Sequence, residues 1–234
     1  MKQIYLRYLV LADTLRQTNI DLLGMDESRK KLLEAIAIRS AQGQPLVVTQ
    51  TMELSDIASP ATIHRRIEIL KKAFESFSNQ NILVIGDVMI DAYMWGNIHR
   101  NSPEAPVPVV DIEKRESRLG GAANVALNIQ SLGATPILFS AVGTDHNGQL
   151  FCELMEKQHL SCKGIQQITS RNTTVKTRII SNSKHVLRVD EECTDPINEK
   201  SIELELVKLL ESNSFDVIIF EDYNKGLLTE NLIS

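Results

Sequence analysis

The sequence predicts an α/β fold, in which a doubly wound, mostly parallel sheet with a small β lid follows a small all-α segment. Three short apolar runs stop at glycine or an acidic residue and predict buried strands: 82–85, 135–142 and 215–220. Amphipathic helices are expected between or beside these runs: 120–131, 149–158 and 198–211. Because parallel neighbours need a crossover connection, this order favours right-handed strand–helix–strand units. We predict two domains, a helical segment over 1–73 and an α/β domain over 74–234.

The composition is that of an ordinary globular protein. Of the 234 residues, 43% are hydrophobic and 24% are charged, and the formal net charge is −5. This charge argues against a dedicated nucleic-acid binder, although a local basic patch is compatible with it. Cys152, Cys162 and Cys193 have no metal-binding spacing and fit reduced thiols. No apolar run approaches the roughly 20 residues that span a bilayer, so we predict no membrane partner. The cysteines, which fit reduced thiols and lack metal spacing, predict a cytoplasmic protein without a metal site.

The stretch over 81–133 carries the groups best suited to a ligand. It joins carboxylates near a strand end to a small-residue turn and a helix start: Asp87, Asp91, Gly120, Gly121 and Asn124. Carboxylates accept hydrogen bonds from hydroxyls, glycines let backbone N–H groups approach, and a helix N-terminus attracts anions. These groups predict a polyol or phosphate site at the carboxyl end of the first strand. On these residues alone, a tight turn beside solvated carboxylates is the alternative.

Six motifs in one order extend this pattern along the chain: Val84-Ile-Gly-Asp-Val-Met-Ile-Asp91, Ser102-Pro-Glu-Ala-Pro-Val-Pro-Val109, Gly120-Gly-Ala-Ala-Asn-Val-Ala126, Val142-Gly-Thr-Asp145 with Gly148, Leu187-Arg-Val-Asp-Glu191 and Asp222-Tyr-Asn-Lys-Gly226. Together they resemble the N-terminal part of the ribokinase-like (PfkB-type) sugar kinases, most of all the D-glycero-beta-D-manno-heptose-7-phosphate kinases. The resemblance covers about 74–234. It implies ATP-dependent phosphorylation of heptose 7-phosphate in the synthesis of ADP-heptose, a lipopolysaccharide-core precursor. It also implies ATP and Mg²⁺ as cofactors of the complete enzyme.

The resemblance also implies the substrate contacts. Asp87, Asp91 and Asn124 would accept or donate hydrogen bonds at sugar hydroxyls, and Gly120 and Gly121 would allow close backbone approach. A phosphate already on the sugar would meet cations from the lid and from the last strand: Lys176, Arg178, Arg188 and Lys225. Solvated lid charges are the alternative for the first three cations. A helix start capped by Asp222 is the alternative for the region of Lys225.

A small β lid is expected over the sugar. The prolines at 103, 106 and 108 interrupt an apolar stretch and predict an irregular edge strand, because proline cannot donate within a sheet. A second pair of lid strands is predicted over 173–181 and 185–190, with a turn at Asn182-Ser183.

The catalytic end of the family is not found in this sequence. The family's Gly-Ala-Gly-Asp motif supplies a general base and a helix N-terminus, and nothing between Asp222 and Ser234 matches it. No P-loop pattern takes its place. We therefore expect the sugar-binding part of a kinase, with the base beyond Ser234 and little or no turnover by this chain alone. The parallel sheet is expected to end on an unpaired strand with exposed apolar surface.

The segment over 22–73 resembles a bacterial winged-helix domain that lacks its wing. Ser59 is a predicted cap, with Pro60 at the first position of a helix that runs to residue 73. In a helix-turn-helix, this helix brings four residues near the major groove: Thr62, His64, Arg65 and Arg66. A plain helical appendage is the alternative. A sugar-responsive DNA-binding regulator thus stands beside the sugar kinase as a second function, and both the lid and the helical segment are candidate homodimer surfaces.

Overall fold

The structure is a computed structural model that describes part of the chain: residues 59, 61–63, 65, 75, 77–197 and 200–233. Residues 81–127 and 136–234 form one compact unit, and the candidate site lies within it. Among the described residues, no helix has the length and apolar character needed to cross a membrane.

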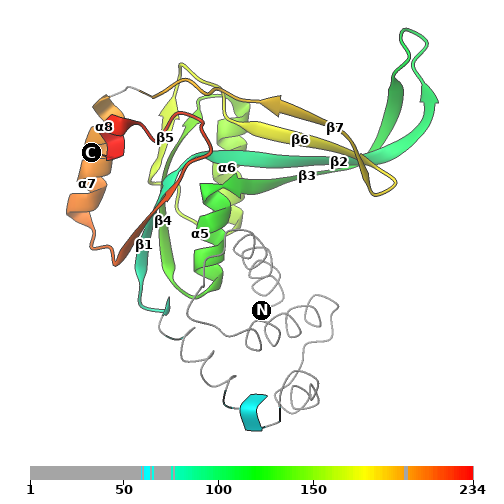
Figure 1. Ribbon diagram of the computed structural model, residues 1–234. Coiled ribbons are helices and arrows are strands. Elements are labelled where there is room, and N and C mark those ends of the chain that lie inside the picture. The colour runs from blue at the N-terminus through cyan, green and yellow to red at the C-terminus, as the bar shows by residue number, and fades with distance from the viewer. Residues whose placement is uncertain are drawn as a thin grey trace. The chain divides into compact units, whose positions relative to one another are not determined.

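The first sheet has four strands in the order β5-β4-β1-β8 (Figure 1). Their bounds are β1 (Asn81–Gly86), β4 (Thr135–Gly143), β5 (Ile165–Ile168) and β8 (Val217–Glu221). β1 pairs with β8 in parallel, and β4 pairs with β5 in parallel. The predicted strands over 82–85 and 135–142 are confirmed.

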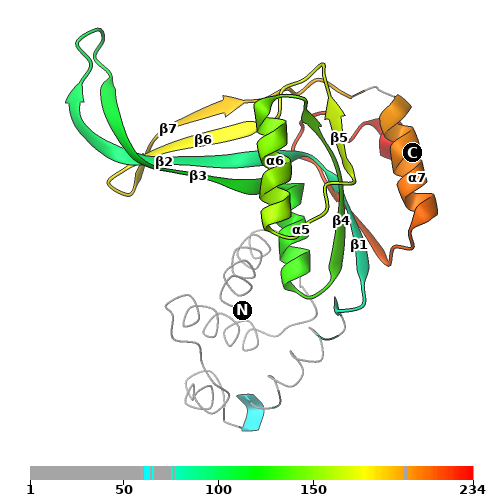
Figure 2. The same cartoon turned by 180° about the vertical axis from the view of Figure 1, so that it is seen from behind.

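Helices cover both faces of this sheet. They are α5 (Ala122–Ser131), α6 (His146–Lys157), α7 (Lys200–Ser212) and the short α8 (Glu230–Ile233). Leu83 and Ile85 of β1 form a buried cluster with Ile202 and Leu206 of α7. Figures 1 and 2 show α5 and α6 on the opposite side of the sheet from α7. Burial of each such side chain stabilises the folded state by about 1.5–3 kcal/mol. The apolar strand β1 therefore contributes strongly to the core of the unit. The predicted doubly wound α/β fold is confirmed.

The second sheet is the lid, with the order β3-β2-β6-β7. Its strands are β2 (Val88–Asn101), β3 (Pro108–Gly121), β6 (Val175–Ser181) and β7 (Lys184–Glu191). β2 pairs with β3 and β6 with β7 in antiparallel fashion, whereas β2 and β6 run parallel. Asn182 and Ser183 have φ of 50° and 61°, the left-handed pair that closes a tight hairpin. The predicted second pair of lid strands and its turn are confirmed.

The β2–β3 hairpin differs from the sequence prediction. The stretch around Pro103 was expected as an irregular edge strand, but each hairpin strand has 14 residues and the prolines lie at the tip and at the start of β3. β3 does lie at the edge of its sheet. The outer half of the hairpin is exposed, and its pairing is irregular at Trp95/Gly96 and Ile98/Arg100, so no clean two-residue alternation marks it. Gly120 and Gly121, expected in a turn, are the last residues of β3.

The sequence predicted a buried strand at 215–220. The strand, β8, is present, but the prediction that it is buried is wrong. Val217, Ile218 and Phe220 are 45%, 43% and 48% exposed. Within the described residues β8 pairs only with β1, so its other edge is open. The expectation of an apolar, unpaired strand at this end of the parallel sheet is confirmed.

The helical segment is described at only a few positions. Thr62 donates its N–H to Ser59 Oγ at 3.4 Å, and Ile63 donates to the Ser59 carbonyl at 2.9 Å, so Ser59 is the predicted cap. The Thr62 hydroxyl shares a 2.8 Å hydrogen bond with the Ser59 hydroxyl. His64 and Arg66 lie outside the described residues, as does Pro60. DNA binding by Thr62, His64, Arg65 and Arg66 stays a prediction, and so do the 1–73 and 74–234 domain division and the homodimer.

Candidate functional site

Asp87 lies between β1 and β2 and holds a distant loop. Its side chain is 3% exposed. Oδ2 accepts hydrogen bonds from the N–H groups of Tyr223 and Lys225, both at 3.0 Å, and Oδ1 accepts one from Leu227 at 3.2 Å. A carboxylate has about four acceptor positions, so the backbone of the loop after β8 takes most of them. The predicted contact from Asp87 to a sugar hydroxyl stays a prediction, with little acceptor capacity left for it.

Asp91 is the more available carboxylate. It lies in β2 beside Lys176 of β6 and Arg118 of β3, and its side chain is 23% exposed. Arg178 donates from Nη1 to Asp91 Oδ1 at 2.5 Å. Burial would lower the pKa of Arg178, but this bond raises it, so the guanidinium stays charged and orients the carboxylate.

The glycine pair makes room for these carboxylates. A Cβ on Gly120 would lie 2.5 Å from Asp91 Oδ2 and 2.8 Å from Met89 Cγ. Gly121 has φ of 60°, and a Cβ there would collide with the Asp87 carbonyl oxygen. Asn124 follows in the first turn of α5 and is partly buried. The structure therefore brings Asp87, Asp91 and the glycines together at the end of β3. The space left by the missing side chains of the glycines is used by atoms of Asp87, Met89 and Asp91.

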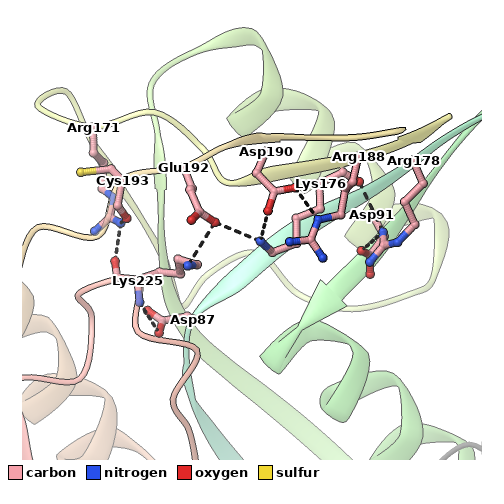
Figure 3. A network of polar contacts seen from close by, with 10 residues as sticks. All are labelled: Asp87, Asp91, Arg171, Lys176, Arg178, Arg188, Asp190, Glu192, Cys193 and Lys225. Atoms are coloured by element: carbon pink, nitrogen blue, oxygen red, sulfur yellow. Dashed lines mark hydrogen bonds and ion pairs between the residues drawn. The ribbon is translucent and has the colours of Figure 1, made fainter. Parts of the chain in front are cut away.

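The predicted cations come from three segments and meet anions (Figure 3). Lys176 Nζ lies 2.9 Å from both Asp190 Oδ2 and Glu192 Oε2. Lys225 Nζ reaches the same Glu192 Oε2 at 3.1 Å. Both lysine side chains are largely buried, with 16% and 13% exposed. Two ammonium groups, one from the lid sheet and one from the loop after β8, thus converge on one carboxylate oxygen.

The charges of this group reinforce one another. Burial alone would lower the pKa of Lys176, but the hydrogen bonds to Asp190 and Glu192 raise it. The bonds from Lys176 and Lys225 lower the pKa of Glu192. Arg188 Nε lies 3.0 Å from Asp190 Oδ1 as an ion pair, although Oδ1 makes no hydrogen bond of good geometry. The pKa shifts of Lys176 and Glu192 therefore both favour the charged form.

An aromatic pair lies on the same lid sheet. Tyr93 and Trp95 stack with ring centroids 5.4 Å apart and an interplanar angle of 15°. Arg118 and Arg178 lie 4.9 and 5.3 Å from the Tyr93 centroid, and Lys114 lies 4.6 Å from that of Trp95. Because alternate residues of β2 share a face, Asp91, Tyr93 and Trp95 continue one surface along the lid.

Three residues that sequence reasoning missed hold the site together. Arg171 donates from Nη2 to the carbonyl oxygens of Cys193 at 3.0 Å and Lys225 at 2.5 Å, which ties the loop after β8 to the segment after β7. Glu192 joins the two lysines. Asp145, which was noted only as part of a motif, caps α6 by accepting from Gly148 N at 2.8 Å. No sequence signal marked Arg171 or Glu192, since their partners lie 16 or more residues away in the chain.

Asp145 also fixes the entry to β6. Its Oδ2 accepts from Thr173 N at 2.8 Å and its Oδ1 from the Thr173 hydroxyl at 2.7 Å. Burial would raise the pKa of Asp145, but these bonds and the one from Gly148 hold it below its ordinary value. The Val142-Gly-Thr-Asp145 motif is therefore a structural joint next to the lid.

A cavity of about 390 Å³ adjoins the loop that carries Lys225. Thr194 and Pro196 line it together with residues of 222–230, including Asp222 and Glu230. Its two acidic groups favour hydroxyls over a phosphate, because like charges repel.

Within the described part of the chain, no group of three or more His, Cys, Asp or Glu side chains is arranged to hold a metal ion.

Comparison with known proteins gives one family. A family model described as pfkB family carbohydrate kinase matches residues 79–224, which is more than half of the 234-residue chain. Bifunctional protein HldE of Pelobacter propionicus is 41% identical over 170 residues, which cover 70% of this chain and 35% of that protein. Bifunctional protein HldE of Helicobacter pylori is 43% identical over 153 residues, which cover 64% of this chain and 32% of that protein. The chain spans about a third of the length of these relatives.

Solved structures of similar fold include a carbohydrate kinase from Agrobacterium tumefaciens, with a TM-score of 0.46 and 18% identity over 60% of this chain and 45% of that one. A ribokinase from Cryptococcus neoformans var. grubii in complex with ADP has a TM-score of 0.38 and 19% identity, over 51% of this chain and 37% of that one.

Proposed function

The chain belongs to the pfkB family of carbohydrate kinases, as its six motifs predicted, and we propose that it binds the sugar phosphate which such a kinase phosphorylates. By the motifs, the sugar phosphate is heptose 7-phosphate and the reaction serves ADP-heptose synthesis. The observation that carries the proposal is the row of cations from β6, β7 and the loop after β8, which runs from Lys225 through Lys176 and Arg188 to Arg178, the partner of Asp91.

Asp91 is the group that we assign to a sugar hydroxyl. Its Oδ1 is held by Arg178, and its Oδ2 lies over Gly120. A carboxylate fixed in this way accepts a hydrogen bond from a sugar hydroxyl without having to be ordered first, which favours one orientation of the sugar. Asn124, Gly120 and Gly121 would complete this end, as the motifs imply.

Lys176, Arg178, Arg188 and Lys225 are the groups that we assign to the phosphate already on the sugar. A phosphate dianion offers strong acceptors, and hydrogen bonds to it from ammonium or guanidinium groups contribute about 1.5–3 kcal/mol each. The lysines are mostly buried, which reduces the solvent screening of such contacts. We assign ATP, Mg²⁺ and the general base to the complete enzymes of the family, because the sequence holds no Gly-Ala-Gly-Asp segment.

Calorimetric titration of the 234-residue chain with heptose 7-phosphate, and separately with the unphosphorylated heptose, tests this proposal. Lys225→Met should weaken binding of the 7-phosphate about tenfold or more and leave the weak binding of free heptose unchanged. Asp91→Asn should weaken both. Asp111→Asn, an exposed residue of β3, is the matched control and should change neither. Absence of any binding of heptose 7-phosphate to the folded chain would refute the proposal.

A further inference from the structure

Glu192 occupies the position that suits an anionic ligand. Its Oε2 receives Lys176 Nζ at 2.9 Å from the lid and Lys225 Nζ at 3.1 Å from the loop after β8. Figure 3 shows the carboxylate between the two ammonium groups, with Asp190 and Arg188 continuing the group along the lid. We propose that Glu192 is an internal anion that fills the two-lysine site and is displaced by the phosphoryl group of the substrate, so that only an anion that binds the two lysines strongly occupies the site.

The attachments of the three partners support displacement of Glu192 rather than of the lysines. The main chain of Lys225 is held at both ends, since its N–H goes to Asp87 and its carbonyl accepts from Arg171. Lys176 is paired in the lid through β2 and β7 and keeps Asp190 as a second partner. Glu192 follows the last residue of β7, and its side chain is 29% exposed. The carboxylate is therefore the member with the least rigid support and the best access to water.

Competition explains why such a site would prefer a phosphate. A ligand with one negative charge replaces Glu192 without gain in charge, whereas a phosphate dianion adds a charge and a third acceptor oxygen. A neutral sugar leaves the Glu192 pairs in place. Breaking the two Glu192 pairs costs every anion the same free energy, so Glu192 lowers the affinity for all of them by one factor. Only an anion that binds the two lysines strongly, such as a phosphate dianion, then still occupies the site, and weaker anions are rejected.

Glu192→Gln tests the inference, which rests on the proposed sugar-phosphate site. The amide keeps the size and removes the competing charge. We expect Glu192→Gln to bind inorganic phosphate and heptose 7-phosphate about tenfold more tightly than the wild type, and free heptose no better. Glu191→Gln, which removes the same charge one residue earlier, is the matched control and should leave all three affinities unchanged. If Glu192 only holds the lysines in place, Glu192→Gln binds both phosphates equally or more weakly, and the inference is overturned.

A measurement on the wild type covers the case in which the variant does not fold. The ¹³C signal of the Glu192 carboxyl should move when heptose 7-phosphate saturates the protein, because the carboxyl leaves Lys176 and Lys225 while Asp190 and Arg188 keep their own pair. An unchanged signal at saturation overturns the inference and leaves the sugar-phosphate site standing. No binding of heptose 7-phosphate by the wild type would instead remove the proposed function itself.

Discussion

Replacement of Asp87 tests the claim that this residue is a structural anchor. Asp87→Asn keeps one acceptor oxygen and puts an NH₂ group where the other oxygen accepted. In the wild type, the carboxylate accepts the N–H groups of Tyr223, Lys225 and Leu227. Whichever way the amide turns, at least one of these donors faces another donor.

The expected loss of stability follows from those three bonds. Hydrogen bonds to a charged acceptor contribute about 1.5–3 kcal/mol, and a buried N–H left without an acceptor costs about 1–3 kcal/mol. The three bonds share one carboxylate and are not additive, so we expect a loss of about 3 kcal/mol in the free energy of unfolding. For a chain of this size, that lowers Tm by about 6–12 °C.

Urea unfolding followed by circular dichroism measures the loss, and amide hydrogen exchange locates it. Exchange should accelerate at Tyr223, Lys225 and Leu227 more than at β1. Asp111→Asn, on the exposed part of β3, is the control and should change stability by less than about 0.5 kcal/mol. If Asp87→Asn loses no more stability than the control, while binding of heptose 7-phosphate collapses, then Asp87 is a substrate contact and the anchoring argument is wrong.

Three further changes have expected outcomes. Gly226 has φ of 89° and a Cβ there would collide with the Asp195 carbonyl oxygen, so Gly226→Ala should cost more than about 1 kcal/mol of unfolding free energy. The comparison is Gly133→Ala, which also has positive φ but whose Cβ would only make ordinary contact with Ser78. The pKa of Asp145 lies below its ordinary value of 3.8, so its ionised carboxylate stabilises the fold fully above pH 3.8, and this stabilisation is lost as the pH falls through the folded-state pKa. Asp145→Asn should therefore be less stable than the wild type at pH 7 and approach the wild type in acid. An equal difference in unfolding free energy at both pH values would contradict this. Ile218 is 43% exposed on the open strand β8, so Ile218→Lys should reduce self-association in light scattering, and unchanged association would show that this edge is not the adhesive surface.

The sequence predicted the strongly periodic elements and the family, and it missed what depends on long-range contacts. β1, β4 and β6 are apolar or alternating strands whose pattern comes from burial, so their sequences identify them. The outer half of the β2–β3 hairpin mixes exposed and half-buried residues without regular alternation and carries no such pattern. β8 was predicted as buried because its composition is apolar, yet composition does not record which neighbour lies beside a strand.

The site shows the same division. Asp91, Gly120 and Lys225 were found because they stand in motifs, but the partners that define their roles lie far away in the chain. Arg178 is 87 residues from Asp91, and Lys225 is 138 residues from Asp87. Residue type alone left Asp87 and Asp91 equivalent, whereas the geometry separates a buried acceptor of backbone N–H groups from an exposed carboxylate paired with arginine.

That separation bears on how the site would select a phosphate. Asp87 and Arg171 fix the N–H and the carbonyl of Lys225, so the loop after β8 cannot give way when a ligand approaches, and only side chains remain to respond. Of the side chains in contact, Lys176 has Asp190 as a second partner, whereas within the described part of the chain the Glu192 carboxylate pairs with the two lysines alone. With the backbone held in place, a ligand reaches the two lysines only if its charge is sufficient to displace the Glu192 carboxylate. If the loop were loosened by Asp87→Asn, Lys225 could follow Glu192 away from the site, so the tighter phosphate binding expected of Glu192→Gln should be smaller in the double variant than in the single one.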